Sequence, residues 1–228
     1  MILVPDTLLA LQNLARSQRR LLNPLVIGIT GSNGKTSTKD FTAAAMSGKY
    51  SVCATAGNLN NHIGLPLTIL GMSADQNCGV FEMGMNHAGE IAVLAAIAEP
   101  QAAIITNVGV AHIEHLGSRE AIALEKGSLA EAVTASGVVI LNANDEYTPG
   151  IRSRCRANVL TAGVNRGDVK ATILESAAEG SRFNIDFAGR SRIDAFLPFP
   201  ASTWLPTPPS PPPAHGIMEF RPKSSSTD

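Results

Sequence analysis

Hydrophobic residues over most of the chain fall into two alternating patterns. Short continuous apolar runs, typical of buried strands, alternate with segments whose apolar residues recur every three or four positions, as on one face of a helix. The predicted strands are 25–30, 51–54, 78–83, 102–106 and 138–141, and the predicted helices are 6–20, 36–47, 65–70, 88–98 and 118–134. Asp6 or Thr7 and Ser118 are placed to cap two of these helices. The alternation predicts an α/β fold, with a mostly parallel sheet flanked by helices on both faces.

The pattern changes after residue 156. Further strand-like runs follow at 158–161, 171–175, 181–187 and 193–196, with no helical pattern between them. We therefore expect a smaller antiparallel or mixed edge sheet there. Eight of the 14 prolines and the only tryptophan lie at residue 200 or beyond, in a segment with no helix or strand period. Such a composition cannot build a core, so residues 200–228 are expected to form a Pro-rich, disordered tail.

Composition and charge exclude several classes of protein. Hydrophobic residues make up 44% of the 228 residues, enough for a buried core. The 18 Lys and Arg residues against 19 Asp and Glu give a net charge of −1, which argues against a nucleic-acid or membrane-surface partner. No apolar run is long enough to span a membrane. The three cysteines are widely spaced and fit reduced thiols in a cytoplasmic protein.

A glycine-rich turn joins the first predicted strand to the helix that follows. The segment reads GITGSNGKTSTKD, in which the glycines allow successive backbone N–H groups to point at phosphate oxygens. Lys35 would reach the β- and γ-phosphates, and the Thr36 hydroxyl would bind Mg²⁺. Ile29 stands where the general GxxxxGK[ST] pattern has its first glycine, so this is a shorter GxxGKT loop. The predicted phosphate-binding residues are Gly31, Ser32, Asn33, Gly34, Lys35, Thr36 and Ser37.

Other polar candidates follow the ends of predicted strands or lie in helices. Glu82 ends an apolar strand, where a carboxylate needs a cation; either Mg²⁺ shared with Thr36 or Lys35 alone would serve. His112, near Glu114 and His115, could be a metal ligand, a phosphate contact or a surface residue. Lys126 by itself is an ordinary helix lysine. An amide-rich segment suits either a polar substrate or a plain turn, and contains Asn58, Asn60, Asn61 and His62.

Four segments taken together resemble the central ATPase domain of the Mur ligases: TGSNGKTSTKD, TAGNLNNHIGLPLT, FEMGMNHAGEI and ITNVGVAHIEHLGS. The resemblance is strongest to members that add D-Ala-D-Ala to UDP-N-acetylmuramoyl-tripeptide in peptidoglycan synthesis. It implies an ATP-dependent amide ligase that uses ATP and Mg²⁺ and works through an acyl phosphate.

The resemblance also implies roles for single residues. Lys35 would be a catalytic phosphate contact, with Thr36 and Glu82 as Mg²⁺ ligands. His112 would help to hold a second Mg²⁺. Lys126 matches a lysine that many members carbamylate into a further metal ligand. The catalytic residues that the resemblance implies are thus Lys35, His112 and Lys126. The amide-rich segment from Asn58 to His62 would line the substrate side.

The resemblance further implies a division of the chain. Residues 1–23 match the end of an N-terminal domain and a linking helix, and residues 24–199 match the central ATP-binding domain. The family's C-terminal ligase domain has no counterpart, so we expect this chain alone to be inactive or nearly so. A permitted codon choice for residues 201–208, shifted by one base, encodes a sequence close to the family's next helix. The tail is therefore interpreted as a possible frameshifted translation.

Alternatives remain open from the sequence. The chain could belong to another Mur ligase or to a relative similar to folylpolyglutamate synthase. It could also be a non-catalytic nucleotide-binding module, or a non-functional gene product.

Overall fold

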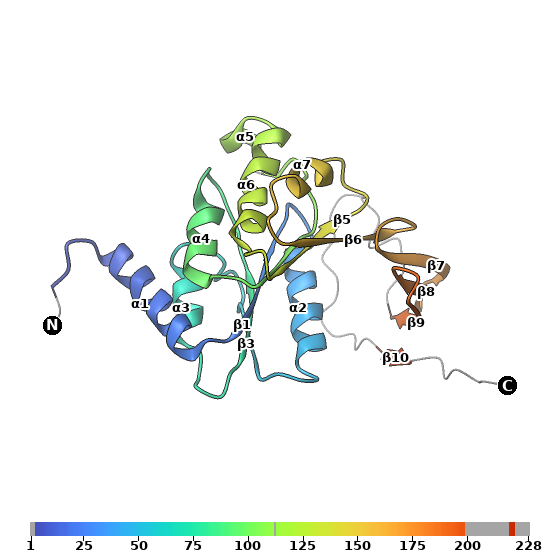
Figure 1. Cartoon of the computed structure of the whole chain (residues 1–228), viewed down its shortest axis with the longest axis horizontal. Helices are drawn as coiled ribbons and strands as arrows, with labels where there is room; N and C mark the ends of the chain where they lie inside the picture. Colours follow the sequence, from blue (N-terminus) through green and yellow to red (C-terminus); the bar gives the residue numbers. More distant parts are fainter. Residues whose placement is uncertain (1–2, 112, 199–218, 222–228) are drawn as a thin grey trace. The chain divides into compact units, whose positions relative to one another are not determined.

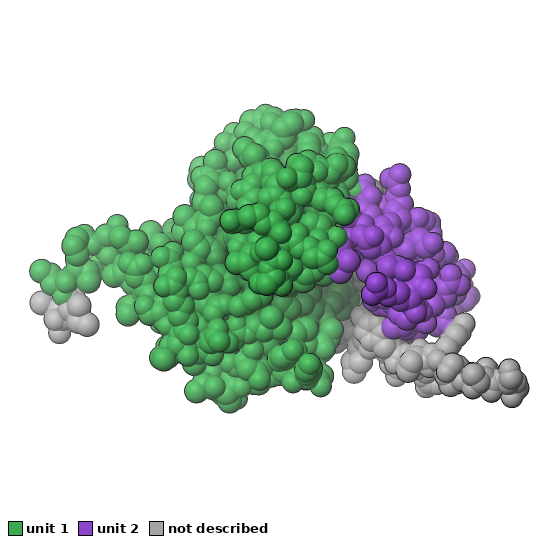
Figure 2. All heavy atoms as spheres, viewed as in Figure 1, with its two compact units in different colours: residues 1–141, 145–159 green, residues 142–144, 160–228 purple. Residues whose placement is uncertain are grey.

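The computed structural model describes residues 3–111, 113–198 and 219–221. The chain divides into two compact units (Figure 2), of which unit 1 comprises residues 1–141 and 145–159, and unit 2 comprises residues 142–144 and 160–228. Within the described residues, no helix combines the length and the apolar character needed to cross a membrane.

Unit 1 is built on a parallel sheet, as the alternation of strands and helices predicts. Its strands pair in the order β5-β4-β1-β3-β2, and the pairs β1–β3, β1–β4, β2–β3 and β4–β5 are all parallel. Their bounds are β1 (Leu25–Thr30), β2 (Val52–Ala54), β3 (Cys78–Glu82), β4 (Ala102–Ile105) and β5 (Val138–Asn142). The prediction of an α/β fold with a mostly parallel sheet is confirmed.

Helices cover both faces of this sheet (Figure 1). On one face, β1 and β3 pack Ile27, Ile29, Cys78 and Val80 against α2 (Lys35–Met46). The larger core lies on the other face, under α1 (Thr7–Leu22), α3 (Gly64–Leu70), α4 (Glu90–Ala98) and α6 (Arg119–Ala132). Alternate residues of each central strand thus pack into the cores on opposite faces of the sheet. This explains why these strands are continuous apolar runs in the sequence.

Helix ends follow the predicted capping residues in two places. Asp6 accepts a hydrogen bond from Leu9 N at the start of α1, and Ser118 accepts one from Ala121 N at the start of α6. The predicted start of α4 at residue 88 is wrong, because Gly89 is the N-cap and the helix begins at Glu90. Two short helices, α5 (Ile113–Leu116) and α7 (Thr148–Arg152), were not predicted, since elements of four and five residues are too short to show a helical period.

Arginines on α1 fix this helix to the end of α4. Arg19 is buried, and its guanidinium donates to Ala98 O at 2.8 Å and to Glu99 O at 2.9 Å. Arg16 donates to Ala96 O at 2.9 Å. The last carbonyl groups of a helix have no partner within it, so these arginines satisfy acceptors that would otherwise be lost on packing.

Unit 2 contains the mixed strands expected after residue 156. They are β6 (Asn158–Val164, which begins in unit 1), β7 (Val169–Ala177), β8 (Gly180–Phe187), β9 (Ser191–Leu197) and β10 (Glu219–Arg221). The β7–β8, β8–β9 and β9–β10 pairs are antiparallel, whereas β6 pairs with β7 in parallel.

The expectation that no regular structure occurs in residues 200–228 is wrong for β10, which pairs with the open edge of β9. An edge strand offers unpaired backbone groups to any extended segment, whatever its composition. The predicted tail otherwise lies outside the described residues.

Candidate active site

The loop from Gly31 to Lys35 connects β1 to α2, as predicted. A Cβ atom at Gly31 would lie 1.8 Å from Thr106 Oγ1, so only glycine fits at this close approach. Gly34 has φ of +77° and is the N-cap of α2, and glycine is the residue that adopts this left-handed conformation most readily. Because Gly34 brings no side chain to cap the helix, the first-turn N–H groups and the positive end of the helix dipole face the loop.

A second loop, residues 106–109 after β4, stabilises the conformation of the glycine-rich loop through hydrogen bonds. Ser32 N donates to Asn107 O at 3.0 Å, and Asn33 N donates to Asn107 Oδ1 at 2.9 Å. In return, Gly109 N donates to Ser32 Oγ at 2.7 Å. The sequence interpretation singled out His112 in this region and missed Asn107, whose only signal was its place after a strand at the carboxyl edge of the sheet.

Lys35 is the first residue of α2, and its side chain contacts the backbone of the glycine-rich loop. Its Nζ donates to Gly31 O at 2.9 Å and to Ser32 O at 3.4 Å. Burial lowers the pKa of this lysine, and the negative charge of Glu82 partly offsets the effect. The ammonium therefore lies at the loop in an environment that favours an additional anion.

The structure brings Thr36 and Glu82 together. Glu82 is buried at the end of β3, and its Oε2 accepts a 2.8 Å hydrogen bond from Thr36 Oγ1. Its Oε1 accepts one from Asn60 Nδ2, also at 2.8 Å. A hydroxyl and a carboxylate side by side are hard oxygen donors of the kind that Mg²⁺ prefers, so these residues fit the metal that the sequence predicts.

Lys126 is buried in α6, with only 2% of its surface exposed. Burial, reinforced by the positive charge of Lys35, lowers the pKa of Lys126 to about 7, and Glu125 opposes the shift. The structure thus places the two predicted catalytic lysines within electrostatic range of each other. An amine with such a pKa is substantially neutral at physiological pH.

Glu125, which the sequence analysis did not single out, organises the segment that follows Glu82. Its carboxylate accepts hydrogen bonds from Gly89 N at 2.7 Å and from Ile91 N at 2.8 Å. It therefore caps α4 from the neighbouring helix α6. No local sequence signal could have found this contact, because the partners are more than 30 residues apart.

The four predicted substrate-binding residues divide into two pairs. Asn60 contacts Glu82, as described above, and Asn61 Oδ1 accepts from Gly64 N at 2.9 Å and from Ile63 N at 3.1 Å where α3 begins. Asn58 and His62 are exposed. The contact of all four residues with substrate stays a prediction.

His112 lies outside the described residues, so its predicted role as a metal ligand also stays a prediction. Its neighbours Glu114 and His115 are in α5, where His115 Nε2 lies 3.7 Å from Glu114 Oε1. The His115 ring also lies near His87, with 5.2 Å between the ring centroids.

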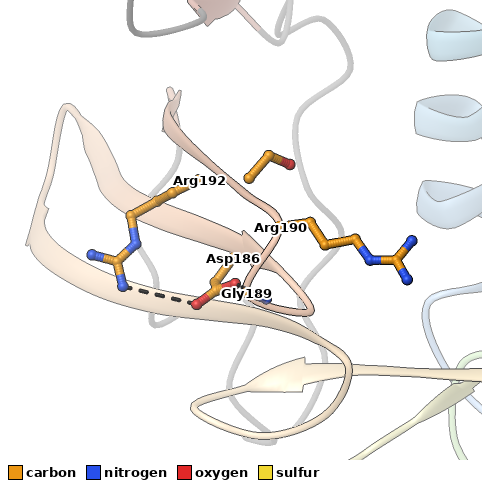
Figure 3. Close-up of a pocket in the computed structure, with 5 residues that line it drawn as sticks. Asp186, Gly189, Arg190 and Arg192 are labelled. Atoms are coloured by element: carbon orange, nitrogen blue, oxygen red, sulfur yellow. Dashed lines mark hydrogen bonds and ion pairs between the residues drawn. The ribbon is translucent and has the colours of Figure 1, made fainter. Parts of the chain in front are cut away.

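A pocket in unit 2 contains none of the predicted site residues (Figure 3). Its lining comes from the end of β8, the start of β9 and the turn between them, and Arg192 and Asp186 form an ion pair there at 3.8 Å.

Comparison with known proteins shows which family the chain belongs to. The family model described as the Mur ligase middle domain matches residues 29–205. This match covers most of the chain and includes every residue of the site described above, so the chain belongs to the Mur ligase family.

Individual relatives and solved structures are also similar to the chain. The chain is 43% identical over 184 residues to the UDP-N-acetylmuramoyl-tripeptide–D-alanyl-D-alanine ligase of Bacillus subtilis, a match that covers 81% of this chain and 40% of the relative. The fold is similar to that of MurF from Acinetobacter baumannii, with a TM-score of 0.82 at 33% identity over 87% of this chain and 44% of that one. A MurF ligase from Thermotoga maritima in complex with ADP matches with a TM-score of 0.78 at 30% identity, over 86% of this chain and 45% of that one. The chain thus spans less than half the length of these relatives.

Proposed function

We propose that this chain supplies the ATP-binding and carboxylate-activating part of an amide ligase that joins D-Ala-D-Ala to UDP-N-acetylmuramoyl-tripeptide. The observation that carries the proposal is the Thr36–Glu82 pair beside a glycine-rich loop that leads into α2. The two substrates are those that appear in the name of the B. subtilis relative.

The loop would bind the phosphates of ATP. Its backbone N–H groups and the N-terminal end of α2 favour negative charge, and the T. maritima relative was crystallised with ADP. Lys35 would exchange its two carbonyl acceptors for β- and γ-phosphate oxygens. Thr36 and Glu82 would hold Mg²⁺, which when bound neutralises charge on the phosphates.

The chemistry would then run in two steps. The terminal carboxylate of the tripeptide attacks the γ-phosphorus of ATP, the bond to the bridging oxygen breaks, and acyl phosphate and ADP result. The amine of D-Ala-D-Ala attacks the acyl carbon, inorganic phosphate leaves, and the amine loses a proton. Lys35 would stabilise negative charge on the phosphoryl group as it is transferred.

Lys126 would serve as a carbamate. A neutral amine combines with CO₂ to give a carbamate anion and a proton, which converts a buried cation into a metal-binding group. The pKa of about 7 supports this reaction, because much of Lys126 is neutral at physiological pH. Two further roles rest on the resemblance to the family: that of His112 as a metal ligand, and that of Asn58, Asn60, Asn61 and His62 as substrate contacts. We also place the enzyme in the cytoplasm, where its free cysteines would remain reduced.

A ligation assay separates this proposal from its alternatives. In a chimera, residues 24–199 of this chain replace the matching segment of the B. subtilis relative. The chimera and the unaltered chain are each incubated with ATP, Mg²⁺, UDP-N-acetylmuramoyl-tripeptide and D-Ala-D-Ala. Mass spectrometry then detects the product formed with D-Ala-D-Ala. We expect product from the chimera, and its loss to background in the chimera that carries Glu82→Gln.

Other outcomes favour other readings. UDP-N-acetylmuramoyl-dipeptide joined to single amino acids would indicate a different Mur ligase, and folate joined to glutamate would indicate an enzyme similar to folylpolyglutamate synthase. ATP binding that is indifferent to Glu82→Gln and Lys126→Met, without ligation, would indicate a non-catalytic module.

A further inference from the structure

A second lysine of α2, Lys39, is buried one turn after Thr36. Lys39 is 6% exposed. It follows Thr36 by three positions and Lys35 by four, so it neighbours each of them on the surface of the helix. Burial of an ammonium group is costly unless hydrogen bonds and a counter-charge compensate it. The Lys39 Nζ lies 2.9 Å from the largely exposed carboxylate of Asp40, and it also donates a 2.9 Å hydrogen bond to Thr55 O.

Thr55 connects Lys39 to Glu82, the predicted Mg²⁺ ligand, through hydrogen bonds. This threonine is 2% exposed, immediately after β2, and its N–H donates to Val80 O at 3.1 Å. Its Oγ1 accepts a 2.9 Å hydrogen bond from Glu82 N. One residue therefore contacts both the buried ammonium, through its carbonyl, and the backbone of Glu82, through its hydroxyl.

These contacts form a closed ring. The Thr36 hydroxyl donates a hydrogen bond to the Glu82 side chain, and the Glu82 backbone N–H donates one to the Thr55 hydroxyl. The Thr55 carbonyl then accepts one from Lys39. Lys39 and Thr36 are then joined by a single turn of α2. The ring fixes the end of β3 relative to α2, and therefore fixes the position of the Glu82 carboxylate beside the Thr36 hydroxyl.

We propose that Lys39 is a positioning residue, which sets the distance between Glu82 and Thr36 through Thr55 and thereby sets the affinity for nucleotide-bound Mg²⁺. The inference rests on the proposed function, since it concerns the metal site of that function. Lys39 acts through Thr55 and need not touch the nucleotide. Loss of its ammonium should therefore weaken Mg²⁺-dependent binding and spare the contacts that the loop makes with the phosphates.

The test measures ADP affinity of the whole chain by calorimetry, without Mg²⁺ and with saturating Mg²⁺. The ratio of the two affinities is the Mg²⁺ enhancement. Lys39→Met keeps the aliphatic chain and removes the ammonium, Lys39→Arg keeps a donor, and Lys49→Met removes an exposed lysine just beyond the same helix. We expect the Mg²⁺ enhancement to fall about tenfold in Lys39→Met, the usual effect of losing a group that orients a metal ligand. Lys39→Arg should restore most of it, and Lys49→Met should match the wild type.

A purely structural role predicts different results. An unchanged Mg²⁺ enhancement in Lys39→Met, or an equal loss of ADP affinity with and without Mg²⁺, would overturn the inference while leaving the proposed function intact. If the wild type itself shows no Mg²⁺ enhancement, the proposed function fails and the inference fails with it.

A second pair of variants keeps the test decisive if Lys39→Met does not fold. Thr55→Val removes the hydroxyl acceptor of Glu82 N, whereas Thr55→Ser retains it. The ring predicts a reduced Mg²⁺ enhancement in Thr55→Val only. Equal behaviour of the two variants would overturn the inference.

Discussion

Thr36 and Glu82 lie 46 positions apart in the sequence, yet Thr36 Oγ1 donates a 2.8 Å hydrogen bond to Glu82 Oε2. Thr36 is in the first turn of α2, and Glu82 is the last residue of β3. The parallel arrangement of β1 and β3 brings these positions to the same edge of the sheet. This is the edge at which α/β proteins bind their ligands.

Removal of either member of this pair should abolish the Mg²⁺ dependence of ADP binding. Thr36→Val removes a hard oxygen ligand, and Glu82→Gln replaces a charged carboxylate with a neutral amide, which is a weaker ligand. The double variant should lose little more than either single variant, because two ligands of one metal act as a unit. Calorimetry with and without Mg²⁺ measures the effect. Thr38→Val, at a neighbouring position of the same helix, is the matched control and should retain the dependence. Independent, additive losses from the two variants would contradict a shared metal.

Gly31→Ala should destabilise the chain by about 1–3 kcal/mol, the typical cost of forcing extra atoms into a packed site. The added Cβ would lie 1.8 Å from Thr106 Oγ1, whereas at Gly48 the nearest atom to an added Cβ is 3.6 Å away. Urea unfolding of Gly31→Ala and of the control Gly48→Ala gives the two free energies of unfolding. Equal stability of the two variants would show that a Cβ fits at Gly31.

The burial of Lys126 predicts a rise in stability with pH. The pKa of Lys126 is about 7 in the folded chain against 10.5 for an unperturbed lysine. Between these values the unfolded state binds the proton more tightly, so the free energy of unfolding should increase as the pH rises from about 7 to about 10.5. Below pH 7 both states are protonated, and this contribution is flat.

The measurement is urea unfolding across this pH range in CO₂-free buffer, which leaves the amine unmodified. Lys126→Met should lack the rise that the wild type shows, and Lys49→Met should retain it. Parallel pH profiles for the wild type and Lys126→Met would show that Lys126 has an ordinary pKa.

Glu125→Gln should destabilise α4 by about 1–2 kcal/mol, the range found for loss of a helix cap. The carboxylate accepts from both Gly89 N and Ile91 N, and an amide can offer only one oxygen to the two donors. Thermal unfolding of Glu125→Gln and of Glu114→Gln, an exposed control, measures the difference. Equal midpoints for the two variants would indicate that the cap contributes nothing.

The fold and the centre of the site could be predicted because both depend on local patterns. Buried strands such as Leu25–Thr30 are uniformly apolar, and Asp6 and Ser118 cap helices through contacts within three residues. Thr36 and Glu82 could be paired in advance because each follows or ends a strand of one parallel sheet.

The residues that support the site could not be predicted in the same way. Lys39, Asn107 and Glu125 act through backbone groups of distant segments. Every residue type except proline supplies the same backbone N–H and C=O groups. A hydrogen bond to such a group therefore does not restrict which residue provides it, and no sequence pattern signals the contact. The short strand β10 was missed for a related reason, since its pairing depends on the open edge of β9 and not on its own composition.

The most direct test of the account is calorimetric titration of the unaltered chain with ADP in the presence of Mg²⁺, repeated after EDTA is added and repeated with Lys35→Met. We expect saturable binding that weakens when Mg²⁺ is removed and weakens further in Lys35→Met, because the loop, the lysine and the Thr36–Glu82 pair would all act on one Mg²⁺–nucleotide complex. The absence of ADP binding to the folded chain, or binding that is unchanged by EDTA and by Lys35→Met, would contradict it.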